Sequence, residues 1–476
     1  MKSNIKIKFF GLIAAAVWLA FPAFVSAGKL DSPYKLRYPA LKFNPPVTKR
    51  LVLKNGMTLH LLENHELPIV DISSMVRIGS AYEPAEKAGL ASLTGGVWRS
   101  GGTTTVPPGE LDEKLEFIGA SLETSIGREA GSISLSTLTK DLDEGLRLFA
   151  DLILNPAFDE KRFDVAKERM IEGIKREDDD PTTIARREFK RLLLGDHPFG
   201  HVPTLKTLGR ISRDDCEKFY KDHIGPRNFI IGISGDFYTA EIVGKLEKLF
   251  WDMKPAKQQL PEIPPLPEKI NAGVYIMDKK LPQTVFRSGH FGISRRNPDY
   301  YAVRVMNFIM GGGGFSSRML KDIRSKRGLA YSVWSYFVGG ENLRGRFVTG
   351  GETKAESSYE FMLATRDIIW RMVEHGVSEM ELTLAKESII NSFVFGFDKD
   401  TKIVSKYLWL EYYGLPMDYL ETFRDNIRKV TRADAKRAAA EYLHPDEMII
   451  LAVGDNSVMG KDLARLGPVK YIEPAK

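Results

Sequence analysis

The sequence predicts an α+β fold made of two homologous lobes, each a mainly antiparallel sheet flanked by helices. The chain has 476 residues, which is too long for one ordinary core. Strand and helix patterns come in clumps with hairpins, as in α+β proteins, rather than in strict alternation. Two different motifs also recur at one constant offset along the chain, which indicates an internal duplication.

The duplicated motifs are a buried strand and a helix. Residues 228–236 and residues 448–455 both have the pattern of a buried strand that ends in Gly-Asp. Residues 166–168 and residues 385–387 both read Ala-Lys-Glu inside a helical pattern. The sequence separation between Asp236 and Asp455 is the same as that between Ala166 and Ala385. Because two unrelated features share one offset, we interpret the halves as distant copies of each other.

The elements of the first half follow from local patterns. Residues 51–62 predict a strand, a turn at Asn55-Gly56 and a second strand, since Asn-Gly is a strong hairpin signal. Further strands are expected at 69–78 and 132–138, the latter with the alternation of a half-buried strand. Helical patterns predict the remaining elements, at 109–118, 142–154, 159–176 and 181–194.

The second half repeats this rhythm after a proline-rich segment. Residues 255–267 contain prolines that favour an extended, semi-rigid linker, so we place a domain boundary there. The two lobes are then residues 45–254 and 268–476. In the second lobe we expect strands at 273–277 and 284–291 and helices at 300–310 and 316–325.

The N-terminus has the pattern of a secretory signal peptide. Three lysines precede an apolar run from Phe9 to about Val25, and Val25-Ser26-Ala27 fits a small-residue cleavage site. We therefore expect residues 1–27 to be removed and the protein to be periplasmic or secreted, without stable membrane insertion. The alternative is an uncleaved anchor, but the run is short for a bilayer and contains Pro22.

Charge and cysteine content exclude several classes. The formal charge is +6, and removal of the three leader lysines leaves +3. So small a surplus, without a basic stripe interleaved with aromatics, argues against nucleic acid as a partner. The single cysteine, Cys216, cannot form an internal disulfide and is interpreted as a structural thiol.

Three stretches resemble the insulinase/pitrilysin family of metallopeptidases, which includes the mitochondrial processing peptidase. They are the hairpin at Asn55-Gly56, residues 78–91 and residues 311–331. The resemblance covers nearly all of the mature chain. It implies two similar α+β lobes per chain, paired with a second such chain around a closed chamber.

The resemblance also shows that this sequence lacks the zinc-binding motif of the active members. Active members carry His-x-x-Glu-His on a helix, where two imidazoles bind zinc and the Glu activates water. The matching positions here are Ser92, Gly95 and Gly96, and only the distal ligand position survives, as Glu172. One carboxylate does not hold zinc, so we expect no metal in this chain. We further expect the glycine face to contact the backbone of a partner or of a peptide.

The second half keeps another part of the family pattern. In that family an Arg and a Tyr seven residues apart reach across the chamber to the zinc site, and Arg324 and Tyr331 match. An Arg donates paired hydrogen bonds to a carbonyl, and a Tyr hydroxyl stabilises an oxyanion. The structural alternative is an exposed helix Arg and a strand aromatic. Residues just before the pair are expected to contact substrate or to form a turn between helices: Gly311, Gly312, Gly313, Gly314 and Ser316.

The resemblance thus implies a non-zinc subunit of a heterodimeric zinc metallopeptidase. A homologous partner would hold the zinc, and the substrate would be a peptide or an unfolded protein segment. One alternative is a catalytically silent scaffold or peptide-binding protein of the same fold. A self-sufficient peptidase would rest on His197 and His201, which are four residues apart, although Pro198 and Gly200 break any helix there.

Overall fold

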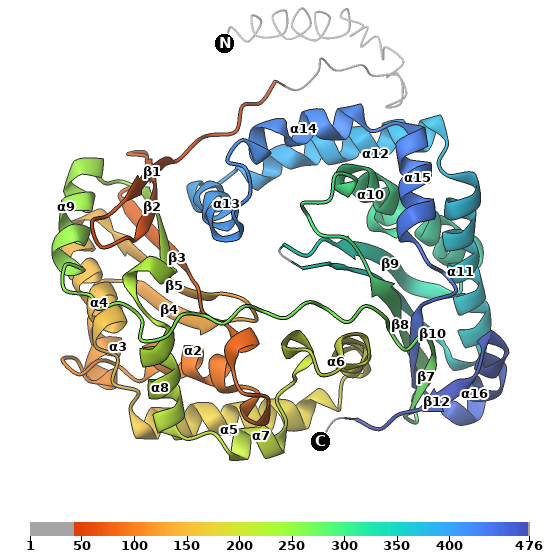
Figure 1. Ribbon diagram of the computed structural model, residues 1–476, viewed down its shortest axis with the longest axis horizontal. Helices are drawn as coiled ribbons and strands as arrows, with labels where there is room; N and C mark the ends of the chain where they lie inside the picture. Colours follow the sequence, from red (N-terminus) through yellow and green to blue (C-terminus); the bar gives the residue numbers. More distant parts are fainter. Residues whose placement is uncertain (1–41, 342, 475–476) are drawn as a thin grey trace, which may run out of the picture. The chain divides into compact units, whose positions relative to one another are not determined.

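The computed structural model describes residues 42–341 and 343–474 (Figure 1). The predicted signal peptide, residues 1–27, lies outside the described residues. From Asn44 onward the chain forms one unit. Within the described residues, no helix has both the length and the apolar character needed to cross a membrane.

The first sheet has six strands and is mainly antiparallel. Its strands are β1 (Lys49–Val52), β2 (Thr58–Glu63), β3 (Ile69–Val76), β4 (Ser121–Ile126), β5 (Gly131–Leu138) and β6 (Phe229–Gly235). They lie in the order β1-β2-β6-β3-β5-β4. β2 and β6 pair in parallel, and the other pairings are antiparallel.

The second sheet has the same plan. Its strands are β7 (Gly273–Asp278), β8 (Gln283–Phe291), β9 (Ala330–Val338), β10 (Arg346–Lys354), β11 (Ile449–Gly454) and β12 (Val469–Tyr471). Their order is β12-β7-β11-β8-β10-β9. β11 and β12 each pair in parallel with β7, and the remaining pairings are antiparallel.

Helices flank both sheets (Figure 1). The first half contains α2 (Leu90–Ser100), α3 (Pro108–Phe117), α4 (Leu142–Leu154), α5 (Glu160–Glu177), α6 (Pro181–Leu194), α7 (Leu205–Gly209), α8 (Arg213–His223) and α9 (Thr239–Leu249). The second contains α10 (Tyr300–Asn307), α11 (Ser358–His375), α12 (Glu379–Ser392), α13 (Asp400–Tyr413), α14 (Tyr419–Lys429), α15 (Arg432–Tyr442) and α16 (Asn456–Leu463). The predicted α+β class with two homologous lobes is confirmed.

The constant offset between the two halves is a structural repeat down to single hydrogen bonds. Lys167 and Lys386 occupy the two Ala-Lys-Glu motifs, in α5 and α12. The Lys167 amine donates to the carbonyl of Ile211 at 2.8 Å, and the Lys386 amine donates to the carbonyl of Val430 at 2.9 Å. Both contacts join residues 44 positions apart, so the copies kept the same local anchor.

The two lobes exchange one helix each. α6 and α13 begin and end at positions separated by this same offset, and each packs on the sheet of the other half. Ile184 and Phe189 of α6 share a buried cluster with Ile449 of β11. Val404 and Leu408 of α13 share another with Ile230 of β6. The packing units therefore differ from the sequence halves by one helix in each direction.

A surface ion pair adds to this exchange. Arg50 of β1 donates two hydrogen bonds to the Glu411 carboxylate of α13, at 2.7 and 2.8 Å.

The proline-rich residues 255–267, where the domain boundary was predicted, contain neither helix nor strand.

The chain after α10 differs from the expected pair of α-helices at 300–310 and 316–325. α10 ends at Asn307, and a π-helical turn follows, η7 (Phe308–Gly312), in which the Gly313 N–H donates to the Phe308 carbonyl at 2.8 Å. A 3-10 turn, η8 (Gly314–Ser316), leads to a second π-helical segment, η9 (Leu320–Lys326). The glycine run explains the difference, because Gly314 takes φ +58°, a conformation that interrupts an α-helix.

Candidate functional site

The predicted pair Arg324 and Tyr331 lies where η9 meets an edge strand. Arg324 belongs to the π-helical segment, a type of turn that is frequent at functional sites. Gly328, at φ +65°, then turns the chain through the left-handed region. Tyr331 is the second residue of β9, the last strand of its sheet, and its side chain is 81% exposed.

The Arg324 guanidinium lies against two exposed aromatic rings. Its central carbon is 4.5 Å from the ring centre of Tyr331 and 4.9 Å from that of Phe315. Contacts of this kind stabilise an exposed cation by roughly 0.5–1 kcal/mol each. The sequence prediction did not include Phe315, which is 70% exposed. Its position directly after four glycines was the available signal.

This arrangement prepares the guanidinium for a planar polar group. Stacking occupies the flat face of the side chain, whereas the N–H donors lie in its plane and stay available for hydrogen bonds. The adjacent Tyr331 hydroxyl is a second donor. Two donors at one exposed strand edge suit a peptide carbonyl or a developing oxyanion.

The predicted substrate-contact residues form the turn before η9: Gly311, Gly312, Gly313, Gly314 and Ser316. Gly311 is buried, and a Cβ there would lie 2.5 Å from Oγ of Ser335 in β9, so the close approach of turn and strand requires glycine. The Ser316 hydroxyl donates to the Gly313 carbonyl at 2.7 Å and serves the turn itself. Gly312 and Gly314 are exposed and leave backbone groups at the surface.

The helix that matches the zinc motif is α2. Ser92 and Gly96 lie on its exposed face, whereas Gly95 is buried. A Cβ at Gly95 would lie 2.4 Å from the backbone nitrogen of Ile126 in β4, while one at Gly96 would meet nothing within 4 Å. At Gly95 the close backbone neighbour is therefore this chain's own strand rather than a partner. Gly96 leaves open space.

Glu172, the surviving distal position, is an exposed residue of α5. Its carboxylate pairs with Lys175 at 2.7 Å, and this hydrogen bond lowers the pKa of Glu172 below its ordinary value. Zinc sites need three or four nitrogen, sulfur or oxygen ligands in tetrahedral geometry. One hydroxyl, at Ser92, and one carboxylate that is already paired do not fit that requirement.

His197 is engaged in the fold. Its Nε2 lies 2.9 Å from the Pro264 carbonyl, and its Nδ1 accepts the Phe199 N–H at 3.0 Å. Both ring nitrogens are used, so this geometry leaves His197 no atom for a metal. The observation therefore removes the main support for the alternative of a self-sufficient peptidase, in which His197 and His201 would hold a metal.

Glu83 is a buried carboxylate whose role was not foreseen. Its Oε1 accepts the Gly89 N–H at 2.9 Å and its Oε2 accepts the Ala91 N–H at 2.7 Å, so it caps the N-terminus of α2. Burial raises the pKa of Glu83 to about 7, although the two N–H donors oppose this rise. The carboxyl group thus fixes the position of the degenerate helix.

Two family models match the chain. Residues 60–197 match the model described as Insulinase (Peptidase family M16), and residues 210–389 match the one described as Peptidase M16 inactive domain. An uncharacterized zinc protease of Rickettsia bellii is 29% identical over 286 residues, which cover 60% of this chain and 68% of that protein. The non-peptidase homolog YmxG of Helicobacter pylori is 24% identical over 373 residues, covering 78% of this chain and 85% of that protein.

Solved structures agree with this assignment. A peptidase M16 inactive domain from Pseudomonas fluorescens has a TM-score of 0.79 at 26% identity, covering 86% of this chain and 98% of that chain. The periplasmic protease PqqL from Escherichia coli has a TM-score of 0.74 at 15% identity, covering 88% of this chain and 48% of that chain, and shows the shared fold. The chain therefore belongs to peptidase family M16, the insulinase family.

Proposed function

We propose that this chain is the non-zinc subunit of a heterodimeric M16 metallopeptidase in the periplasm or outside the cell. The observation that carries the proposal is the Arg324 guanidinium, which stacks on Tyr331 and Phe315 at an exposed strand edge. A homologous chain with an intact His-x-x-Glu-His motif would hold the zinc. The substrate would be a peptide or an unfolded protein segment.

The chemistry assigned to this chain is binding and charge stabilisation. Arg324 would hold a substrate carbonyl through in-plane N–H donors, and Tyr331 would donate its hydroxyl to the oxyanion that develops on the scissile carbonyl. The zinc of the partner would polarise that carbonyl and activate water.

The exposure of Tyr331 and Phe315, the two rings beside Arg324, supports this role. Tyr331 and Phe315 are large aromatic rings at 81% and 70% exposure on neighbouring segments. Exposed apolar groups that cluster in this way mark interaction sites more often than scattered ones do. A pair kept only for stability would gain little from such exposure, because the stacking is worth roughly 0.5–1 kcal/mol.

The test is a peptide-cleavage assay with this chain alone, the zinc-bearing homologue alone and the two mixed. We expect activity in the mixture and a rise of about tenfold or more in KM for Arg324→Ala, because one lost charge-assisted hydrogen bond to the bound substrate exceeds the 1.4 kcal/mol that corresponds to tenfold. Tyr331→Phe should lower kcat with little change in KM, because the hydroxyl acts on the transition state.

A matched control separates this effect from a general loss of stacking. Arg465 lies over the Tyr359 ring at 4.1 Å, so Arg465→Ala and Tyr359→Phe make the same two changes at a similar pair outside the proposed site. Light scattering should show that all four variants assemble with the partner. Full activity of the partner alone, or indifference to Arg324→Ala in the mixture, would overturn the proposal and leave a silent scaffold or peptide-binding protein.

A further inference from the structure

A cavity of 760 Å³ lies between the two lobes, within the size range of ligand pockets. Its walls come from α5, α6, the β4–β5 hairpin and the face of the second sheet that α6 covers. We call it the cationic cavity because six cationic residues line it: Arg128, Arg186, Arg187, Lys190, Arg287 and Arg346. Neither Arg324 nor Tyr331 is among its lining residues.

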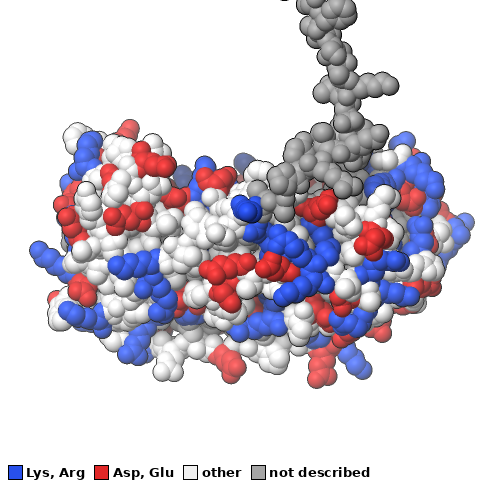
Figure 2. All heavy atoms as spheres, turned by 90° about the horizontal axis from the view of Figure 1, so that it is seen from above, with Lys and Arg blue, Asp and Glu red and all other residues white. Residues whose placement is uncertain are grey.

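The acidic residues of the lining do not balance this charge. Glu129 pairs with Arg128 at 3.0 Å, and Glu177 pairs with Arg187 at 3.2 Å. The other four cations of the cationic cavity form no ion pair with any described residue. Acidic and basic side chains are interspersed over the face of the molecule in Figure 2. The cavity therefore concentrates one sign of charge.

Two of these cations stand on one face of the second sheet. Arg287 of β8 lies opposite Gly350 of β10, and Arg346 is four residues before Gly350, so both side chains project to the same side. Arg287 stacks on Trp334 at 5.0 Å, and its buried Nε has no hydrogen-bond partner among the described residues. Burial and the nearby Arg186 and Arg346 lower the pKa of Arg287.

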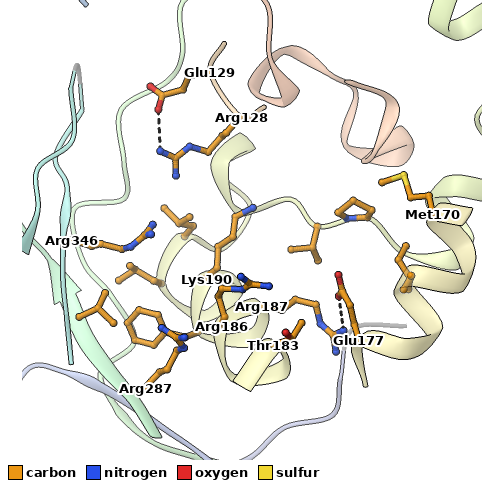
Figure 3. Close-up of a pocket in the computed structure, with 18 of the residues that line it drawn as sticks. Arg128, Glu129, Met170, Glu177, Thr183, Arg186, Arg187, Lys190, Arg287 and Arg346 are labelled. Atoms are coloured by element: carbon orange, nitrogen blue, oxygen red, sulfur yellow. Dashed lines mark hydrogen bonds and ion pairs between the residues drawn. The ribbon is translucent and has the colours of Figure 1, made fainter. Parts of the chain in front are cut away.

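Lys190 reaches the same space from α6. Figure 3 shows Arg128, Lys190 and Arg346 directed into the cavity from three different elements. The Lys190 amine donates to the His201 carbonyl at 3.0 Å, and burial together with Arg128 and Arg346 lowers its pKa to about 8. Such a cluster is unfavourable for the free protein, since each charge is partly desolvated beside others of like sign.

The fold does not require the cations at Arg186 and Lys190. Because α6 and α13 are duplicate copies, Arg186 and Lys190 of α6 correspond to Ser405 and Trp409 of α13, at the offset that relates the two halves. The copy makes the same packing on the opposite sheet without them. Clusters that destabilise a protein and are dispensable for its fold are characteristic of functional sites.

We propose that the cationic cavity binds an acidic segment of a peptide, whose carboxylates contact Arg186, Arg287 and Arg346. The arginine fork matches a carboxylate through two parallel hydrogen bonds. The same walls carry apolar side chains, among them Ile174, Leu193 and Val348, which suit the neighbouring residues of a peptide better than a bare inorganic anion. The choice of a peptide rests on the proposed function, whereas the anionic character follows from the cavity alone.

The experiment measures fluorescence anisotropy of a labelled peptide that alternates Glu or Asp with Leu, added to this chain without any partner. A second peptide of the same length carries Gln and Asn in place of the acids. We expect the acidic peptide to bind at least about tenfold more tightly, because one lost charge-assisted hydrogen bond exceeds the 1.4 kcal/mol that corresponds to tenfold. Its affinity should fall as ionic strength rises.

Variants locate the binding. The double variant Arg287→Gln/Arg346→Gln should weaken the acidic peptide by about tenfold or more and should not lower the melting temperature, since it relieves repulsion. Lys206→Gln/Lys461→Gln removes two exposed cations elsewhere and should leave binding unchanged. If the cavity variant fails to fold, Arg186→Gln, which removes the third proposed contact, replaces it.

Several results would overturn the inference. They are equal binding of the neutral peptide, equal loss in the control variant, or saturable binding of tripolyphosphate alone with no binding of the acidic peptide. Since the assay contains only this chain, it can fail while the mixed cleavage assay succeeds, and the reverse also holds. The two proposals are therefore separable.

Discussion

Two adjacent glycines of α2 show how much a single residue position is determined by its neighbours. Gly95 faces β4 so closely that a Cβ would lie 2.4 Å from the Ile126 nitrogen, whereas Gly96 faces open space. In sequence the two are indistinguishable, and both fall in the degenerate zinc motif.

Alanine at each position should therefore have opposite effects on the free energy of unfolding. Gly95→Ala forces β4 away from α2 and should destabilise the protein by roughly 1–3 kcal/mol, as overpacked sites do. Gly96→Ala should stabilise it by roughly 0.5–1 kcal/mol, because alanine is the better helix former. Urea unfolding of both variants against the unmodified chain gives the comparison. Equal shifts in the same direction would contradict the packing described for Gly95.

The sequence motif predicts the pair Arg324 and Tyr331, but it does not predict which other residues contact the pair. The two residues follow from a motif at a fixed spacing. The contact of Arg324 with Phe315 depends on the glycine turn, which folds Phe315 back beside η9, and no local pattern encodes that path.

Among the elements, α2 depends on one buried carboxyl group. Glu83 accepts two N–H donors of its first turn, and burial raises the pKa of Glu83 to about 7. A carboxyl whose folded pKa exceeds the unfolded value stabilises the protein below the unfolded pKa. That contribution is lost as the pH rises through the folded pKa.

Stability should therefore fall between about pH 5 and about pH 8 by up to about 3 kcal/mol from this group, and Glu83→Gln should flatten the slope. Urea midpoints across this range measure the effect. Glu172→Gln is the control, because Lys175 lowers the pKa of Glu172, so its contribution persists above the unfolded pKa and is lost only in acid. The account would be wrong if Glu83→Gln and the unmodified chain had parallel pH profiles.

Elements with strong local signals were predicted well. The helices expected at 142–154 and 181–194 coincide with α4 and α6, because periodicity marks both and a proline at the first helical position marks α6. The expected helix at 316–325 is instead a 3-10 turn followed by η9. There the left-handed conformation of Gly314 interrupts the helical pattern.

The molecule as a whole depends on the exchange of α6 and α13. A sequence gives the period of each helix but not the sheet on which it packs, so the prediction could not assign either helix to the opposite lobe. The cationic cavity was hidden for the same reason, since Arg128, Arg287 and Arg346 are separated by long stretches of chain.

Leu408→Ala tests the exchange. This side chain of α13 is 2% exposed and packs with Ile230 of the first sheet, so the change should cost roughly 2–5 kcal/mol. Calorimetry should show one transition shifted to lower temperature, since both lobes share the cluster. Leu384→Ala, at a 44% exposed position of α12, should shift it little. Two separated transitions, with only one of them moved, would show that the lobes unfold independently.

The exchanged helices also bear on how such a chain arose and how it tolerates being cut. In each half, one face of the sheet is covered by a helix from the other half. In return, each half contributes one helix that packs on the sheet of the other half. Two copies of one ancestral half would complete each other by the same reciprocal exchange, so a single-lobed ancestor is self-complementary as a dimer. Fusion of the two genes then converts that association into an intramolecular one. By the same geometry, we expect the two fragments produced by a nick within residues 255–267 to stay associated, since each half still packs on a helix of the other.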